Sequence, residues 1–129
     1  MAEVLRKYID KNTSQEDFNI IMGDFNDYPI NESLDEILVK DDLLNLMSSS
    51  QVSGIGSYNY RGNWDWLDQI IISKEISSFK LIKFGAFKDD FMMYTNKKGE
   101  VYPNRSFGGN NWYGGYSDHL PVFLKMSFF

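Results

Sequence analysis

Three short stretches of the chain place small polar or ionisable residues next to apolar runs. They read Gly23-Asp24-Phe25-Asn26, Leu67-Asp68-Gln69-Ile70 and Ser117-Asp118-His119-Leu120-Pro121. Carboxylate, amide and imidazole groups can move protons, bind hard cations and hold anionic oxygen atoms. If the fold brings these stretches together, they could position water and a phosphate group for hydrolysis.

The first stretch follows the apolar run 18–22, which is typical of a buried strand that ends at Gly23. If the backbone is still extended there, Asp24 and Asn26 point to the same side. A carboxylate could then take a proton from water beside an amide that binds a phosphate oxygen. The same spacing is also ordinary turn chemistry, and from this motif alone the turn is the commoner explanation.

Asp68 lies at the mouth of a strand predicted over 67–72, shortly before the isoleucines at 70, 71 and 72. Burial of a carboxylate is costly unless it is paired, and the simplest partner is His119, the one histidine of the chain. Their hydrogen bond would fix the imidazole tautomer and favour a charged ring that faces a phosphate oxyanion. The alternatives are an aspartate that caps a loop and a purely structural histidine.

The third stretch adds Asp118, which could bind a hard cation, directly or through water, or orient a neighbouring group. The glycines at 114 and 115 let the backbone turn sharply and approach a ligand. Arg105 could bind a phosphate, although a solvent-exposed position is the simpler interpretation. Three strand ends could bring the candidate residues to one sheet edge, where α/β folds hold ligands. These residues are Asp24, Asn26, Asp68, Asp118 and His119.

Strands and helical patterns alternate along the chain and predict a single α/β domain over 1–129. Val4, Leu5, Tyr8 and Ile9 mark one face of a short helix, and Ser33 with Glu36 matches a capping box that opens another. The segment 43–47 fits a strand or a helix, and 88–115 reads as irregular. Further strands are predicted over 57–61, 79–87 and 120–126.

Composition narrows the function classes. The chain has 129 residues, 43% of them apolar and 16% aromatic, which is ample for a core. Its net charge of −5 includes no basic stripe, so charge does not indicate nucleic acid, although a local patch or a cation could still hold phosphate. The absence of cysteine excludes disulfides and thiolate metal sites. No apolar run approaches the ~18 residues of a membrane span.

Together and in this order, the three stretches resemble the endonuclease/exonuclease/phosphatase superfamily, the deoxyribonuclease I-like phosphoesterases, from about residue 18 to 126. The resemblance covers the C-terminal half of that domain. It implies half of a four-layer α/β/β/α sandwich, with one mixed sheet and helices on one face. It also implies hydrolysis of a phosphodiester or phosphomonoester with magnesium, or with manganese or calcium in its place.

The resemblance also assigns roles to individual residues. Asp24 is similar to the aspartate that activates the attacking water and contacts the metal, and Asn26 to the asparagine that contacts phosphate. Asp68 is similar to the partner of the catalytic histidine. Asp118 resembles the carboxylate that assists metal or water, and His119 resembles the histidine that stabilises the pentacovalent phosphate.

The family's N-terminal half supplies an asparagine, a magnesium-binding glutamate and a second histidine, for which residues 1–17 offer no room. We therefore expect little or no activity from this chain alone. One apolar sheet face should be exposed, to be covered by the missing half or by self-association.

A non-catalytic binding module that keeps the fold is the rival interpretation. Aromatic side chains near the site could stack a base or sugar ring, contact a lipid headgroup, or simply pack loops. They are Tyr58, Tyr60, Trp64, Trp66, Phe107, Trp112, Tyr113 and Tyr116. The segments 58–66 and 114–116 resemble a bacterial branch of the superfamily that is commonly exported, which implies a periplasmic or extracellular location.

Overall fold

The isoleucine run of strand β5 (Asp68–Ser73) forms the centre of a three-stranded antiparallel sheet, between β1 (Ile20–Asp24) and β2 (Leu43–Asn45). Ile70, Ile71 and Ile72 are all fully buried, because both faces of this strand are covered. The structure, a computed structural model, describes residues 1–75 and 79–128. Within these residues no helix is long and apolar enough to cross a membrane.

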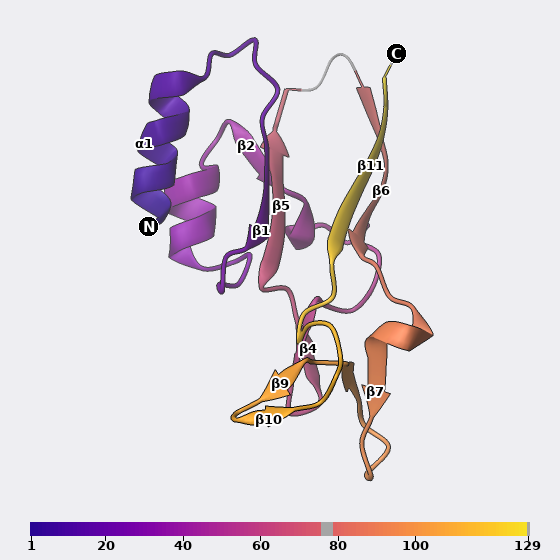
Figure 1. The fold of residues 1–129 in the computed structure, drawn as a ribbon. Helices are drawn as coiled ribbons and strands as arrows, with labels where there is room; N and C mark the ends of the chain where they lie inside the picture. Colours follow the sequence, from indigo (N-terminus) through magenta and orange to yellow (C-terminus); the bar gives the residue numbers. More distant parts are fainter. Residues whose placement is uncertain (76–78, 129) are drawn as a thin grey trace.

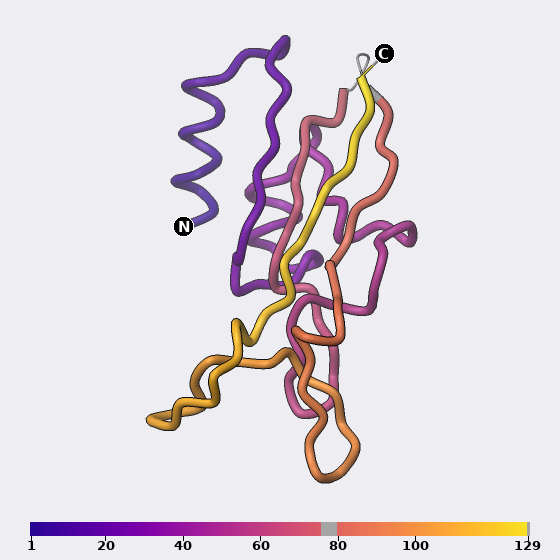
Figure 2. Tube along the Cα trace, turned by 45° about the vertical axis from the view of Figure 1, so that its right-hand side comes forward, coloured from indigo at the N-terminus to yellow at the C-terminus, as the bar shows by residue number. Residues whose placement is uncertain are grey.

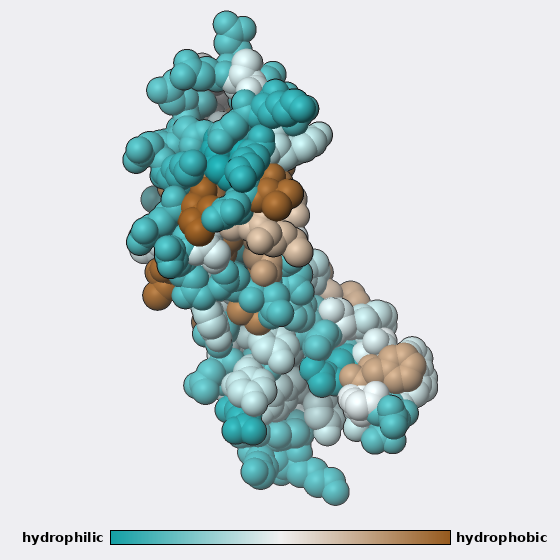
Figure 3. Space-filling model, turned by 90° about the vertical axis from the view of Figure 1, so that its left-hand side faces the viewer, coloured by the Kyte–Doolittle hydropathy of each residue, from teal (hydrophilic) through white to brown (hydrophobic). Residues whose placement is uncertain are grey.

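One face of this sheet packs against helix α1 (Ala2–Asn12) and the π-helical segment η1 (Ser33–Val39) (Figure 1). Ile9, Leu34 and Leu38 meet Ile71 there. The outer face of this layer is mainly hydrophilic, with scattered hydrophobic side chains (Figure 3). Confining apolar contacts to the inner side is the usual arrangement of an amphipathic helix.

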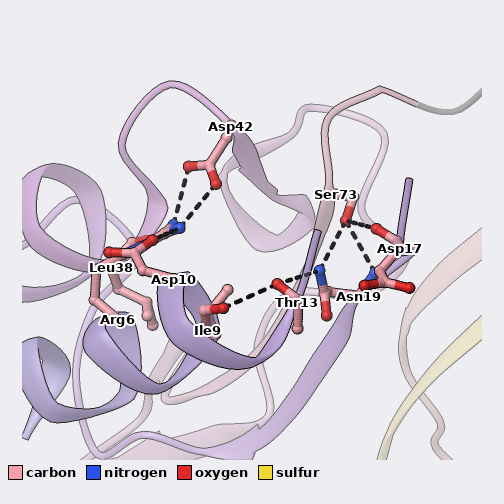
Figure 4. A network of polar contacts seen from close by, with 9 residues as sticks. All are labelled: Arg6, Ile9, Asp10, Thr13, Asp17, Asn19, Leu38, Asp42 and Ser73. Atoms are coloured by element: carbon pink, nitrogen blue, oxygen red, sulfur yellow. Dashed lines mark hydrogen bonds and ion pairs between the residues drawn. The ribbon is translucent and has the colours of Figure 1, made fainter. Parts of the chain in front are cut away.

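The expected apolar face of α1 is wrong in part, because Val4 and Tyr8 are exposed. Arg6 takes the inward position instead. Its guanidinium reaches Asp42 at 2.9 Å and the carbonyl oxygen of Leu38 at 3.2 Å (Figure 4). A buried arginine is tolerated because these acceptors satisfy its N–H groups, and the rotation that brings it inward turns Val4 and Tyr8 outward.

The other face of the sheet is covered by an antiparallel pair, β6 (Phe79–Ala86) and β11 (Val122–Phe128). These strands run side by side in both views (Figures 1 and 2). Phe84 and Leu124 pack with Ile70 and Ile72. The expected exposed apolar face is therefore largely covered, and a half-exposed strip remains on β1 at Ile20 (43%) and Met22 (47%).

The α/β fold class is confirmed, but the single mixed sheet becomes two facing antiparallel units. The chain passes from β1 through η1 to β2, and these two strands run in the same direction because each is antiparallel to β5. β5, which comes later in the sequence, lies between them and pairs with both. Strand patterns alone do not reveal such an insertion, since they carry no information on pairing partners.

Short hairpins gather at one end of the two sheets (Figure 1). The segment expected to be irregular, 88–115, contains most of them. They comprise β3 (Tyr58–Tyr60) with β4 (Asn63–Asp65), β7 (Met93–Thr95) with β8 (Val101–Pro103), and β9 (Phe107–Gly108) with β10 (Asn111–Trp112). Single helical turns precede β7 and follow β2, at η3 (Asp90–Met92) and η2 (Leu46–Ser48).

Two local predictions differ from the structure. The segment 43–47 is strand and then 3-10 turn, so both interpretations hold in part. The capping box of Ser33 and Glu36 is wrong, because η1 has Glu32 at its N-cap and no side-chain cap. The Ser33 hydroxyl instead donates a hydrogen bond to Asp27, which fastens η1 to the loop after β1.

Candidate functional site

Two of the predicted carboxylates face each other across one strand pair. Asp24, the final residue of β1, is the cross-strand partner of Asp68, the first residue of β5. Directly opposed residues in antiparallel strands put their side chains on the same face, close together. Their surroundings differ, since Asp24 is exposed whereas Asp68 is only 8% exposed.

His119 meets Asp68 from the segment that leads into β11. Its Nδ1 atom lies 2.6 Å from the Oδ2 atom of Asp68. The backbone holds this residue in place. The Leu120 N–H donates to the Ser57 carbonyl oxygen at 2.7 Å, and His119 pairs with Tyr58 in an isolated antiparallel β-bridge. In addition, the Tyr58 and His119 rings lie 4.7 Å apart between centroids.

Ser57 completes the support of Asp68 and was not foreseen from the sequence. It is fully buried, and its hydroxyl donates to Oδ2 of Asp68 at 2.6 Å while accepting the Asp68 N–H at 3.2 Å. Oδ2 of the buried Asp68 carboxylate therefore contacts both the Ser57 hydroxyl and His119 Nδ1, and these contacts offset its loss of water. Nothing in the position of residue 57, at the start of the strand predicted over 57–61, indicates that it binds Asp68.

Gln69 is a second residue that the sequence did not single out. Its side chain is fully buried, and its Nε2 atom donates to the carbonyl oxygens of Asp27 (2.8 Å) and Trp66 (2.7 Å). Asn45 donates to its Oε1 atom at 3.0 Å. This amide therefore joins the loop after β1 to the segment before β5, next to the strand ends that carry Asp24 and Asp68. A glutamine inside an isoleucine strand is the available signal, because buried amides need partners.

The step from Asp24 to Asn26 is a turn. The Asn26 N–H donates to Oδ1 of Asp24 at 2.8 Å, and Asn26 has a φ of +50°. Asparagine tolerates this left-handed conformation better than most residues. The extended backbone that would align the two side chains is thus absent at this step, and both residues remain exposed beside the site.

Asp27 stabilises the same loop. It accepts hydrogen bonds from the hydroxyl of Ser33, from the side chain of Asn31 and from the N–H of Tyr28 at 3.0 Å. The Ser33 bond is the main reason why the pKa of Asp27 is lower than its ordinary value.

Asp118 lies apart from the other carboxylates. Its Oδ2 atom accepts from Arg105 at 2.8 Å, and both side chains are about half exposed. The preceding turn depends on glycine, because Gly114 has a φ of +74° and a Cβ on Gly115 would lie 2.1 Å from the Asn104 carbonyl oxygen. These glycines serve a close backbone crossing.

Within the described residues, ligand atoms of Asp24, Asp68 and His119 lie within 4.8 Å of one another. Asp68 and His119 already satisfy each other through Oδ2 and Nδ1. Asp24 is consequently the carboxylate best placed to take a cation. Magnesium needs only one or two carboxylates when phosphate oxygens and waters fill its other positions, so the group fits this mode of binding.

Two hollows lie near the site. A smaller one of about 360 Å³ contains Asp68, His119 and the Tyr116 ring. A larger groove of about 660 Å³ begins at Tyr58 and Asp118 and continues along the hairpins. His119 thus lines the smaller hollow, while its neighbours Tyr58 and Asp118 line the larger groove.

The endonuclease/exonuclease/phosphatase family model matches residues 1–127. None of the curated proteins matches the chain. Among solved structures, it is similar to a mannosyl-6-phosphatase of Bacteroides thetaiotaomicron VPI-5482, with a TM-score of 0.59 and 21% identity. The likeness covers 97% of this chain and 43% of that one, so the chain spans less than half the length of that phosphatase. At this identity the likeness shows a shared fold.

Proposed function

The chain belongs to the endonuclease/exonuclease/phosphatase family, and on that premise we propose that it carries the phosphate-binding side of a magnesium-dependent phosphoesterase site. The observation that carries this proposal is the contact between buried Asp68 and partly exposed His119, 2.6 Å apart, next to the exposed carboxylate of Asp24. An oriented imidazole beside an accessible carboxylate suits hydrolysis of a phosphate ester.

In the proposed reaction, Asp68 holds Nδ1 of His119 so that the protonated ring presents its Nε2–H to a phosphate oxygen. Asp24 orients the attacking water and takes its proton as the new bond to phosphorus forms. The bond from phosphorus to the leaving oxygen breaks, and that oxygen takes a proton from solvent. Asn26 and Arg105 are proposed as further contacts to phosphate oxygens.

Magnesium, with manganese or calcium as alternatives, would be held by Asp24, and it would neutralise charge on the phosphate. Asp118 is a second proposed ligand, but it would first have to exchange its ion pair with Arg105 for the cation. Within the group of Asp24, Asp68 and His119, Asp24 is the one carboxylate that is not paired with a cationic or imidazole side chain. We therefore propose that the isolated 129-residue chain hydrolyses phosphate esters slowly or not at all.

The substrate class is a phosphate ester. The similar structure is named as a mannosyl-6-phosphatase, which supports a phosphate ester here as well. A net charge of −5 gives no general attraction for nucleic acid. A non-catalytic binding module remains the alternative, and the ion pair that neutralises Asp118 favours it.

The test is turnover of 4-nitrophenyl phosphate and bis(4-nitrophenyl) phosphate with magnesium, using the protein at the full length of its reading frame. His119→Ala and Asp24→Ala should each lower turnover by about 10²–10⁴-fold. Tyr8→Ala, on the exposed side of α1, is the control. Unchanged turnover in both site variants rejects the assigned roles. An unsubstituted protein that binds inorganic phosphate without turnover establishes the binding module instead.

A further inference from the structure

The larger groove beside the imidazole has an aromatic lining. Tyr60, Tyr94 and Tyr113 contribute rings that are 54%, 53% and 60% exposed. Tyr58 and Tyr102 line it as well. Its volume of about 660 Å³ lies in the range of small-molecule sites, which are mostly apolar or aromatic walls with a few polar groups.

The groove shares its lining with residues that adjoin His119. Tyr58 lines it and also contacts His119, with ring centroids 4.7 Å apart and the ring planes tilted by 35°. Asp118, next to His119 in sequence, lines it together with its partner Arg105. The remainder of an ester whose phosphate is held by the imidazole would therefore have this groove within reach.

At least one aromatic wall rests against the backbone of the groove. The Tyr113 ring lies against Gly108, where an added Cβ would be 2.4 Å from the ring atom Cε2. The backbone holds this segment as well, since the Tyr113 N–H donates to the Ser106 carbonyl oxygen at 2.7 Å. A ring that is already positioned loses little conformational entropy when a ligand covers it.

The chemistry of the walls favours a neutral, hydroxylated ring. Tyrosine offers an apolar face together with a hydroxyl that both donates and accepts hydrogen bonds. The two arginines of the groove are already engaged, Arg105 with Asp118 at 2.8 Å and Arg61 over the Tyr60 ring at 5.1 Å. With one of two cations neutralised, the groove has little charge with which to hold a polyanion.

We propose that this groove is the subsite for the leaving group of the phosphate ester, and that the leaving group is a sugar ring. The apolar face of the sugar lies on the tyrosine rings while its hydroxyls bond to the tyrosine hydroxyls and backbone. This inference rests on the proposed function, because the phosphate must be held at His119 for the sugar to enter the groove.

Binding to the 129-residue chain tests the inference without turnover. Calorimetric titration compares inorganic phosphate, glucose 6-phosphate, mannose 6-phosphate and adenosine monophosphate. The hexose phosphates should bind at least about tenfold more tightly than inorganic phosphate, a gain of roughly 1.4 kcal/mol. Tyr94→Ala and Gly108→Ala, which displaces the Tyr113 ring, should each remove most of that gain and leave the affinity for inorganic phosphate unchanged.

Tyr8→Ala, at a similarly exposed tyrosine on α1, is the matched control and should change neither affinity. Circular dichroism checks that each variant is folded. Equal affinities for inorganic phosphate and the hexose phosphates overturn the subsite but leave the proposed function intact. Tighter binding of adenosine monophosphate, lost in Tyr94→Ala, overturns the sugar assignment in favour of a nucleoside. No binding of any phosphate compound overturns the proposed function together with the subsite.

Discussion

Asp24 and Asp68 oppose each other across β1 and β5, yet only Asp68 has a buried set of donors. The pair therefore divides into a carboxylate that fixes the imidazole and a carboxylate that remains open to water or a cation. This division follows from the strand ends, because β1 ends at Asp24 and turns outward whereas β5 continues into the core.

Replacement of Ser57 by alanine should loosen the imidazole. Oδ2 of Asp68 would lose one of its two donors in a buried setting, and we expect the free energy of unfolding to fall by about 1–3 kcal/mol. Affinity for inorganic phosphate should fall as well, because Asp68 holds His119 less firmly. Urea denaturation and calorimetry measure both effects, and Ser50→Ala, at an exposed loop position, is the control. A variant with unchanged stability and affinity would contradict the role of Ser57.

Substitution of Gln69 separates its donor and acceptor functions. Gln69→Leu removes the partner of the Asp27 and Trp66 carbonyl oxygens, and should destabilise the fold by roughly 1–3 kcal/mol for each buried group left unpaired. Gln69→Glu keeps an acceptor for Asn45 but removes both donors. Both variants should weaken phosphate binding more than Gln51→Leu, an exposed control. Wild-type phosphate affinity in folded Gln69→Leu protein would show that the amide does not position the site.

Acid should destabilise the loop after β1 through Asp27. Because its pKa is lower in the folded chain than the ordinary value of 3.8, its contribution is present above that value and is lost as pH falls through the folded pKa. Asp27→Asn should therefore be less stable than wild type at neutral pH, and should lose less stability as the pH falls below about 4. Urea denaturation at several pH values measures the difference, with Asp89→Asn as an exposed control. Parallel stability curves would refute the assignment.

Asp24→Asn is a clean probe of the cation. The asparagine oxygen can still accept the Asn26 N–H, so the turn and the stability should persist. The negative charge is lost, and the affinity for magnesium in the presence of inorganic phosphate should fall by about tenfold or more. Magnesium titration followed by NMR gives this affinity. If magnesium binds both proteins equally, Asp24 does not hold the metal.

The pairing of Asp68 with His119 could be anticipated because a buried carboxylate needs a partner and the chain has one imidazole. The partner of Asp118 could not be anticipated. Arg105 lies in the segment 88–115, where short hairpins rather than a hydrophobic pattern set the path of the chain. Turn-rich segments carry little periodicity from which pairing can be inferred.

Ser57 and Gln69 were missed for a related reason. Their bonds join residues that are distant in sequence, such as Gln69 and Asp27, and no local spacing encodes such a contact. The longer strands β1, β5, β6 and β11 were predicted nearly to their ends, since isoleucine-rich and aromatic runs favour extended structure, whereas the short strands within 88–115 were not. The division of the strands between two facing sheets could not be predicted, because the sequences of β5 and β6 both have the pattern of a buried strand.

The placement of β11 over Ile70 and Ile72 has a consequence for the order of assembly. During synthesis, α1, β1, η1, β2 and β5 emerge first and can associate through near neighbours. β6 must wait for a partner that emerges only after all the hairpins, and this long sequence separation slows closure. Until β11 has paired with β6, Ile70 and Ile72 remain exposed to solvent on this face of the sheet. A nascent or truncated chain without residues 122–128 should therefore be prone to aggregate, whether or not its phosphate site has formed.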